Sequence, residues 1–144
     1  MYQRILVPTD GSDVTAKAVQ TAVELAKLGG GQLRAISVKE PFPYSAISEM
    51  QPVPPQEFYD AQERIAAGRV EAVKKAAEAA GVVCQSHTVE ALHVWEAILA
   101  YAKDQQCDLI VMASHGRRGV AALLLGSETQ RVLIHSSLPV LIVK

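Results

Sequence analysis

The sequence is 144 residues long and 49% hydrophobic, so it supplies one sizeable core and has no room for a second folded domain. Its 14 Lys and Arg against 15 Asp and Glu leave a formal net charge of -1. This balance lacks the positive excess that holds nucleic acids or acidic membranes, so we expect small molecules or proteins as partners, with no nucleic acid and no membrane.

The first part of the chain predicts a strand, a helix and a second strand. Residues 5–7 are an apolar run that ends at Pro8, and turn and helix-capping residues follow at 9–13. From Val14, apolar residues recur at helical spacing until three glycines at 29–31 stop the helix. Residues 33–38 then predict the second strand.

The middle of the chain predicts a loop, a helix and an edge strand. Residues 42–55 contain four prolines, so we expect a long irregular loop there. Gly81 is a natural C-terminal cap for the helix that follows. Polar residues at 85–88 place the strand at 82–89 on a sheet edge. The helix is predicted from an apolar stripe of Phe58, Ile65, Val70, Val73, Ala77 and Ala80.

The last part predicts a helix at 94–103, a buried strand at 108–113, a glycine-containing loop, a helix at 127–135 and a strand at 140–143. Alternating strands and helices require right-handed crossovers and a parallel sheet covered on both faces. We therefore predict a single-domain α/β fold, an open five-stranded Rossmann-like sheet of order 3-2-1-4-5. Ligands of such sheets bind beyond the strand ends, here at residues 8–10 and 112–116.

Residues 113–129 have the chemistry of a phosphate site. Gly116, Gly119 and Gly126 allow close backbone approach, the helix beginning at Ser127 presents its positive end, and Thr129 adds a second hydroxyl. The same glycines also suit a simple turn, and Ser127 also suits a helix cap, so spacing alone leaves both interpretations open. Neither a P-loop nor a dinucleotide-binding pattern is present.

Other polar residues have ordinary structural interpretations beside the functional ones. Asp10 suits a turn or helix cap as well as a ligand contact. His115 lacks an accompanying nucleophile motif. Cys84 and Cys107 show no metal-ligand spacing, and we interpret both as reduced packing residues. The first residues lack the features of a secretory signal and no apolar run approaches a membrane span, so we expect a cytoplasmic protein.

Taken together, these segments resemble the universal stress protein family across essentially the whole chain, from the run Ile-Leu-Val-Pro-Thr-Asp-Gly-Ser at 5–12 to Pro-Val-Leu-Ile-Val at 139–143. The family's ATP-binding branch carries Gly-x-x-Gly, nine residues, then Gly-[Ser/Thr]. This chain has Ala113-Ser-His-Gly116, nine residues, then Gly126-Ser127, so alanine replaces the first glycine. The resemblance implies one universal stress protein domain over residues 1–144, with nucleotide binding that the added methyl group can weaken.

The resemblance also implies how a nucleotide would lie. The adenine would sit between the first two strand ends, near Asp10 and against Val38, with Pro8 and Thr9 shaping the wall. Glu128 would contribute only its backbone, and any Mg²⁺ would be held by phosphate oxygens and water. The ribose and phosphate side would be Met112, Ala113, His115 and Gly116, and the phosphate tail would meet Gly126, Ser127, Glu128 and Thr129.

Three functions remain open from the sequence. The leading one is a stress-response regulatory protein in which ATP, or ADP or AMP, changes what a protein partner meets. The second is a slow ATP hydrolase or phosphotransferase, and the third is a nucleotide-free interaction protein, to which Ala113 points. The resemblance further implies a homodimer through the apolar C-terminal strand, whose edge would otherwise be exposed.

Overall fold

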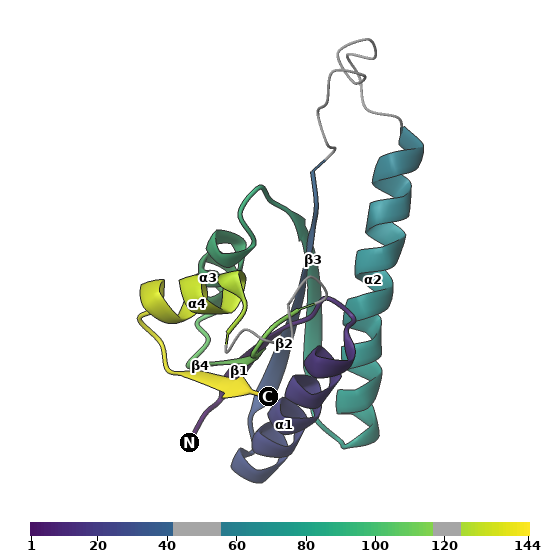
Figure 1. The fold of residues 1–144 in the computed structure, drawn as a ribbon. Helices are drawn as coiled ribbons and strands as arrows, with labels where there is room; N and C mark the ends of the chain where they lie inside the picture. The colour runs from purple at the N-terminus through teal and green to yellow at the C-terminus, as the bar shows by residue number, and fades with distance from the viewer. Residues whose placement is uncertain (42–55, 117–124) are drawn as a thin grey trace.

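The computed structural model describes residues 1–41, 56–116 and 125–144, in which strands and helices alternate (Figure 1). Each predicted helix and strand in these ranges is present, with ends that shift by one or two residues. The predicted loop at 42–55 lies outside the described residues. The elements are β1 (Arg4–Pro8), α1 (Asp13–Gly29), β2 (Gln32–Lys39), α2 (Gln56–Ala79), β3 (Cys84–Glu90), α3 (Val94–Asp104), β4 (Leu109–Ala113), α4 (Ser127–His135) and β5 (Val140–Val143).

The five strands form one parallel sheet in the order β3-β2-β1-β4-β5. This confirms the predicted α/β fold and its strand order. The strand β3 lies at one edge, as its polar residues indicated, and β5 lies at the other. Because the order reverses direction between β1 and β4, the sheet has a topological switch point at the ends of these two strands.

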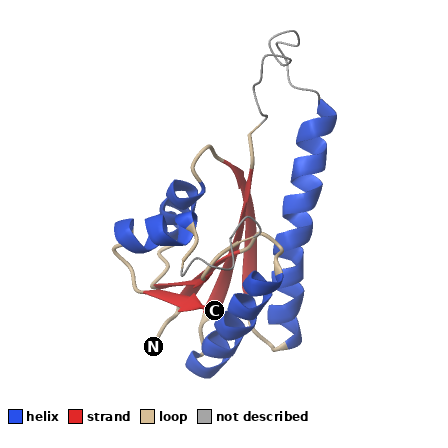
Figure 2. Cartoon of the chain, in the orientation of Figure 1, coloured by secondary structure: helices blue, strands red, loops and turns tan. Residues whose placement is uncertain are grey.

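Two helices cover each face of the sheet (Figure 2). Alternate residues of β1 point to opposite faces, as the pleat of a strand requires. Ile5 and Val7 belong to a buried cluster with α1 and α2, whereas Leu6 belongs to a second cluster with α3 and α4. All three side chains are fully buried, so β1 lies at the centre of the core and fixes the position of the strand end that follows it.

The helix α1 starts and stops at residues suited to those tasks. The hydroxyl of Ser12, its N-cap, accepts a hydrogen bond of 3.3 Å from the backbone N–H of Thr15. At the other end Gly30 has φ 67°, a left-handed conformation that glycine adopts without steric cost, and its N–H binds the carbonyl of Ala26. The start of α1 is thereby held directly beside the end of β1.

The helix α2 is buried along only part of its length. Its buried side chains are Ala66, Val70, Val73 and Ala77, all in the C-terminal part. Ile65 was expected in the buried stripe, and this expectation was wrong, because its side chain is 47% exposed. Ile65 lies one residue before the buried Ala66, about 100° around the helix, so its side chain points away from the face that packs on the core.

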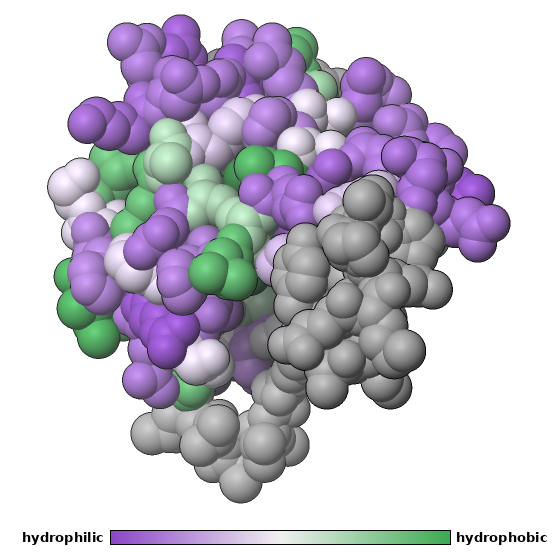
Figure 3. All heavy atoms as spheres, turned by 90° about the horizontal axis from the view of Figure 1, so that it is seen from above, coloured by the Kyte–Doolittle hydropathy of each residue, from purple (hydrophilic) through white to green (hydrophobic). Residues whose placement is uncertain are grey.

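No helix among the described residues is both long and apolar enough to cross a membrane. In the view from above, hydrophilic side chains (purple) cover most of the described surface, and hydrophobic ones (green) form a smaller group between them (Figure 3). Both cysteines are free thiols with buried side chains. Burial raises the pKa of Cys84 and of Cys107 to about 11, which keeps both thiols protonated near neutral pH.

Candidate functional site

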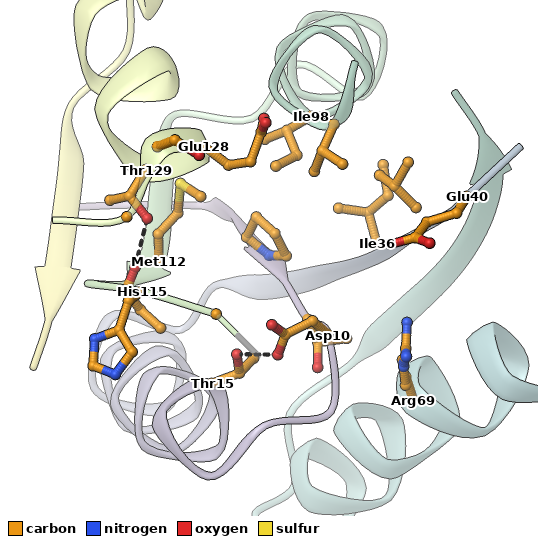
Figure 4. A pocket seen from close by; sticks show the side chains of 18 of the residues that line it. Asp10, Thr15, Ile36, Glu40, Arg69, Ile98, Met112, His115, Glu128 and Thr129 are labelled. Atoms are coloured by element: carbon orange, nitrogen blue, oxygen red, sulfur yellow. Dashed lines mark hydrogen bonds between the residues drawn. The ribbon is translucent and has the colours of Figure 1, made fainter. Parts of the chain in front are cut away.

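A cavity of about 770 Å³ opens at the C-terminal ends of the strands. The register pairs of β1 and β4 stop at Leu6 and Ile110, whereas β1 continues to Pro8 and β4 to Ala113, so the two strand ends form a crevice beyond their paired part. The volume lies within the roughly 300–1,000 Å³ of small-molecule sites. Figure 4 shows side chains from both faces of the sheet converging on this space.

The expected binding residues that the structure describes all line this cavity. Their common feature is that they lie at or just beyond the C-terminal ends of β1, β2 and β4, or at the start of α4. Gly119, also expected in the site, lies outside the described residues. The lining residues that were expected are Pro8, Thr9, Asp10, Val38, Met112, Ala113, His115, Gly116, Gly126, Ser127, Glu128 and Thr129.

Asp10 lines the cavity and also organises the turn into α1. Its Oδ1 accepts hydrogen bonds from the backbone N–H of Ser12 at 2.9 Å and from the hydroxyl of Thr15 at 2.8 Å. Asp10 therefore has both of the positions that the sequence allowed, in the turn before α1 and in the cavity wall. Thr9 acts in the same way, because its hydroxyl accepts from the N–H of Gly11 at 3.2 Å. The first wall is fixed by the bonds that start the helix.

The chain after β4 passes close to Asp10. A Cβ built on Gly116 would collide with Oδ2 of Asp10, so a side chain here would force the carboxylate or the main chain to shift, and the carboxylate is held by Ser12 and Thr15. The preceding residue, His115, also lines the cavity, and its Nδ1 lies 3.1 Å from the hydroxyl of Ser114. Ser114 itself is buried.

The start of α4 is joined to the end of β4 by two short bonds. Gly126 is the N-cap, so the interpretation of Ser127 as the cap was wrong: Ser127 is the first helical residue. The N–H of Gly126 donates to the carbonyl of Ser114 at 2.7 Å. The buried hydroxyl of Thr129 donates to the carbonyl of Ala113 at 3.0 Å. A Cβ on Gly126 would lie 3.2 Å from Cα of His115, which shows how closely the two segments pack.

This arrangement leaves a helix N-terminus open to the cavity. The first intrahelical bond of α4 runs from the N–H of Gln130 to the carbonyl of Gly126. The N–H groups of Ser127, Glu128 and Thr129 precede it, and no partner for them occurs within the described part of the chain. Unpaired N–H groups at the positive end of a helix dipole favour an anion.

The side chain of Glu128 turns away from that anion site. Its Oε2 accepts a hydrogen bond of 2.9 Å from the backbone N–H of Trp95, in the first turn of α3. Its Oε1 lies 3.4 Å from the guanidinium of Arg131. The ring of Trp95 stacks on His135, with ring centres 4.4 Å apart. The carboxylate thus ties α3 to α4.

A wall that the sequence did not predict comes from α2. Gln62, Ile65 and Arg69 follow one another at spacings of three and four residues, which places them on one face of the helix, and all three line the cavity. Glu40 joins them from the end of β2, and Ile36 and Ile98 add apolar contacts. The exposure of Ile65 is explained by this position.

An ion pair holds α2 over β2 and β3 beside this wall. Nζ of Lys39 lies 2.7 Å from Oε2 of Glu63, and the hydroxyl of Thr88 donates to Oε1 of Glu63 at 3.0 Å. The bonds from Lys39 and Thr88 hold the pKa of Glu63 below its ordinary value. The contact is exposed, so its contribution is positional more than energetic.

Comparison with known proteins decides the family. The sequence model of the Universal stress protein family matches residues 1–144, the entire chain. The chain belongs to the universal stress protein family. Universal stress protein MJ0531 of Methanocaldococcus jannaschii is 33% identical to it over 153 residues, which cover all of this chain and 83% of that protein.

Solved universal stress proteins share its fold. The structure of MJ0577, from the same archaeon, has a TM-score of 0.84 at 29% identity and covers 100% of this chain and 96% of that one. A universal stress protein in complex with cAMP has a TM-score of 0.72 at 25% identity, covering 99% of this chain and 97% of that one. At least one solved relative of this fold therefore binds an adenine nucleotide.

Proposed function

We propose that this universal stress protein binds ATP, or the related ADP or AMP, in the cavity between β1, β4 and α4, and uses the nucleotide as a regulatory ligand. The observation that carries the proposal is the open N-terminus of α4, whose N–H groups at Ser127, Glu128 and Thr129 face a cavity of nucleotide size. The cAMP complex of a relative supports an adenine ligand for this fold.

The cavity supplies different chemistry for each part of a nucleotide. The phosphates would meet the amides of α4 and the hydroxyl of Ser127, and the base would lie against the apolar side chains of Pro8 and Val38. Asp10 would lie between them. No group of three His, Cys, Asp or Glu that could cage a metal occurs in the described ranges, so Mg²⁺ would be carried by phosphate oxygens and water.

The departure from the family's motif at Ala113 is compatible with binding. Ala113 is 8% exposed, and it belongs to the buried cluster that β4 shares with α1. Its methyl group therefore contributes to the core, and its carbonyl is already bonded to Thr129. We expect the Ala113→Gly variant to bind ATP within about threefold of the parent affinity, because Ala113 lines the cavity with little exposed surface and its methyl group packs mainly in the core.

A regulatory role is favoured over catalysis by the surroundings of His115. Its nearest hydroxyl partner, Ser114, is only 4% exposed and does not line the cavity, so it is poorly placed to attack a bound phosphate. In a regulatory protein, nucleotide binding orders the cavity walls and changes the surface that a protein partner meets.

Isothermal titration with ATP is the primary test of the proposal. We expect saturable binding of one nucleotide per chain, and the absence of binding by ATP, ADP and AMP would contradict the proposal. Measurement of phosphate release distinguishes a regulatory protein from a slow ATP hydrolase. Release above that of a mock preparation, abolished by Gly126→Val, would show a hydrolase.

We further propose a homodimer through β5. This strand pairs only with β4 within the described sheet, and it carries four apolar residues, of which Leu141 is 38% exposed. A second copy of the strand would cover this apolar edge. Sedimentation of the Leu141→Lys variant should show a monomer, and an unchanged dimer would contradict this interface.

We also place the protein in the cytoplasm. The thiols of Cys84, on β3, and Cys107, in the connection between α3 and β4, are both free and buried, which suits a reducing compartment. Fractionation of cells that express the chain at its natural level tests the location, with recovery in an oxidising compartment as the contrary result.

A further inference from the structure

The helix α3 has no side-chain cap of its own. Its N-cap is His93, whose side chain makes no capping bond, and the first intrahelical bond runs from the N–H of Ala97 to the carbonyl of His93. The backbone N–H groups before Ala97 therefore need partners from outside the helix. Trp95 has one, because its N–H donates to Oε2 of Glu128 at 2.9 Å. A carboxylate from α4 thus caps the start of α3.

The residue that supplies this cap also belongs to the proposed phosphate site. Glu128 follows Ser127 in the first turn of α4, lines the cavity, and has one of the N–H groups that precede the first intrahelical bond of that helix. In Figure 4 its side chain extends from α4 toward α3, where Ile98 lies. One residue therefore offers its main chain to the cavity and its carboxylate to the start of a second helix.

Further contacts hold this carboxylate and the ring beside it. Oε1 of Glu128 lies 3.4 Å from the guanidinium of Arg131. The ring of Trp95 stacks on His135, with ring centres 4.4 Å apart and 24° between the planes. Nδ1 of His135 lies 2.8 Å from the carbonyl of Arg131. The start of α3 therefore rests on α4 through a polar and an aromatic contact, so a change in the first turn of α4 has a direct route to α3.

The N-termini of α3 and α4 both attract the carboxylate of Glu128. Negative charge is favourable in the first turn of either helix. Without its bond to Trp95, the carboxylate would be drawn back to the amides of its own helix. A phosphate at those amides occupies them and repels the carboxylate, which leaves the start of α3 as its favourable position.

Resting on the proposed function, we propose that Glu128 is a positioning residue that couples phosphate binding at α4 to the order of the first turn of α3. Bound nucleotide fixes the main chain of Glu128, which lowers the entropic cost of holding its carboxylate against Trp95. Coupling of this kind is reciprocal, so the bond to Trp95 also prepares α4 for the phosphate. The surface that changes with nucleotide then lies at the start of α3, just after Leu92, which is 77% exposed.

The rival role for Glu128 is a static tie between two helices. Both roles predict that loss of the side chain destabilises the fold, so stability alone does not separate them. Only the coupled role predicts that ATP strengthens the bond to the N–H of Trp95. It also predicts that this bond raises the ATP affinity by the same factor.

The test measures both sides of this equality, starting with amide hydrogen exchange followed by NMR with and without saturating ATP. We expect ATP to slow exchange of the Trp95 amide about fivefold in the parent protein, a coupling of ordinary size. The response should fall to about threefold in Glu128→Gln, whose neutral amide is a weaker acceptor, and vanish in Glu128→Ala, which has none.

Isothermal titration with ATP measures the other side. Glu128→Gln and Glu128→Ala both lack the negative charge, so their difference isolates the bond to Trp95 from repulsion of the phosphate. We expect Glu128→Gln to bind ATP about threefold more tightly than Glu128→Ala, the same factor as its exchange response. Trp95 is the single tryptophan of the sequence, so its emission should change on ATP addition in the parent and stay constant in Glu128→Ala.

The matched control is Glu96→Ala. It removes an exposed carboxylate from the first turn of α3, and this side chain does not line the cavity. The variant should keep the exchange response and the ATP affinity of the parent protein. Loss of the response in Glu96→Ala would show that any acidic residue of this turn suffices and would overturn the role of Glu128.

The remaining outcomes separate this inference from the proposed function. Unchanged exchange of the Trp95 amide in a parent protein that binds ATP saturably would overturn the coupling and leave nucleotide binding intact. This result needs no variant, so it holds even if Glu128→Ala fails to fold. Equal exchange responses in Glu128→Gln and Glu128→Ala would also overturn it and leave a static tie. Failure of the parent protein to bind ATP would remove both proposals.

Discussion

Two parts of the cavity wall are built differently: the backbone end, residues 113–116 and 126–129, and the side-chain end, formed by Glu40, Gln62, Ile65 and Arg69. At the backbone end, Gly116 and Gly126 bring the main chain within contact of Asp10 and His115, and Thr129 bonds a carbonyl. At the side-chain end, Arg69 and Glu40 project from elements far apart in the sequence. A substitution should therefore damage the first end by steric collision and the second by loss of a side-chain contact.

The largest effect is expected for Gly116→Ala, at the backbone end. The new methyl group would collide with Asp10, and moving either group costs about 1–3 kcal/mol. ATP affinity should fall about 10- to 100-fold, as measured by isothermal titration. The matched control is Gly68→Ala on α2, where an added methyl group meets nothing within 4 Å. The control should raise the free energy of unfolding by up to about 1 kcal/mol and leave affinity unchanged.

Thr129→Val tests the bond that attaches α4 to β4. The variant leaves the buried carbonyl of Ala113 without its donor, which should lower the free energy of unfolding in urea by about 1–3 kcal/mol. Thr21→Val removes a similar hydroxyl-to-carbonyl bond, to Lys17, on the exposed surface of α1, and should cost less than about 0.5 kcal/mol. Equal losses of unfolding free energy in the two variants would contradict a particular contribution of the Thr129 bond to stability.

Glu128→Gln tests the tie between α3 and α4. The amide keeps an acceptor for the N–H of Trp95 but removes the negative charge at the start of α3, so we expect a loss of about 0.5–1 kcal/mol in unfolding free energy. Because Trp95 stacks on His135, its fluorescence should change with the variant. An unaltered emission spectrum and midpoint would contradict the tie.

The smallest effect is expected for Glu63→Gln, beside the side-chain end. The pKa of Glu63 is lower in the folded protein than its ordinary 4.5, so the ionised group favours folding above pH 4.5 and this stabilisation is lost as the pH falls through the folded-state pKa. The variant should unfold slightly earlier in urea at pH 7 and match the parent at low pH. A difference that grew toward low pH would reverse the sign and refute the assignment.

The backbone end could be predicted from the sequence because glycine and a helix start are local signals. The residues from Gly116 to Thr129 are typical of a phosphate site. The family resemblance adds Pro8 and Val38 as the residues expected beside the adenine. The sequence could not show that Gly126 is the N-cap of α4 and Ser127 its first residue, because both residue types are common at N-caps.

The side-chain end could not be predicted for a tertiary reason. Ile65 fits the predicted apolar stripe of α2 as well as Val70 does, and only the way in which α2 packs turns Val70 to the core and Ile65 to the cavity. Arg69 gives no signal in sequence because arginine on a helix is usually solvated. The aliphatic part of Arg69 packs on Gly11, which lies 58 residues earlier in the sequence (69 − 11). Such contacts follow from the fold alone.

The central claim is that the open amides of α4 hold the phosphates of a nucleotide, and backbone amide NMR during an ATP titration tests it directly. We predict that the amide resonances of Ser127, Glu128 and Thr129 shift with one common saturation curve, while that of Gln130, whose N–H is bonded to Gly126, shifts least. Saturable ATP binding that leaves these three amides unmoved and shifts residues elsewhere would contradict the claim.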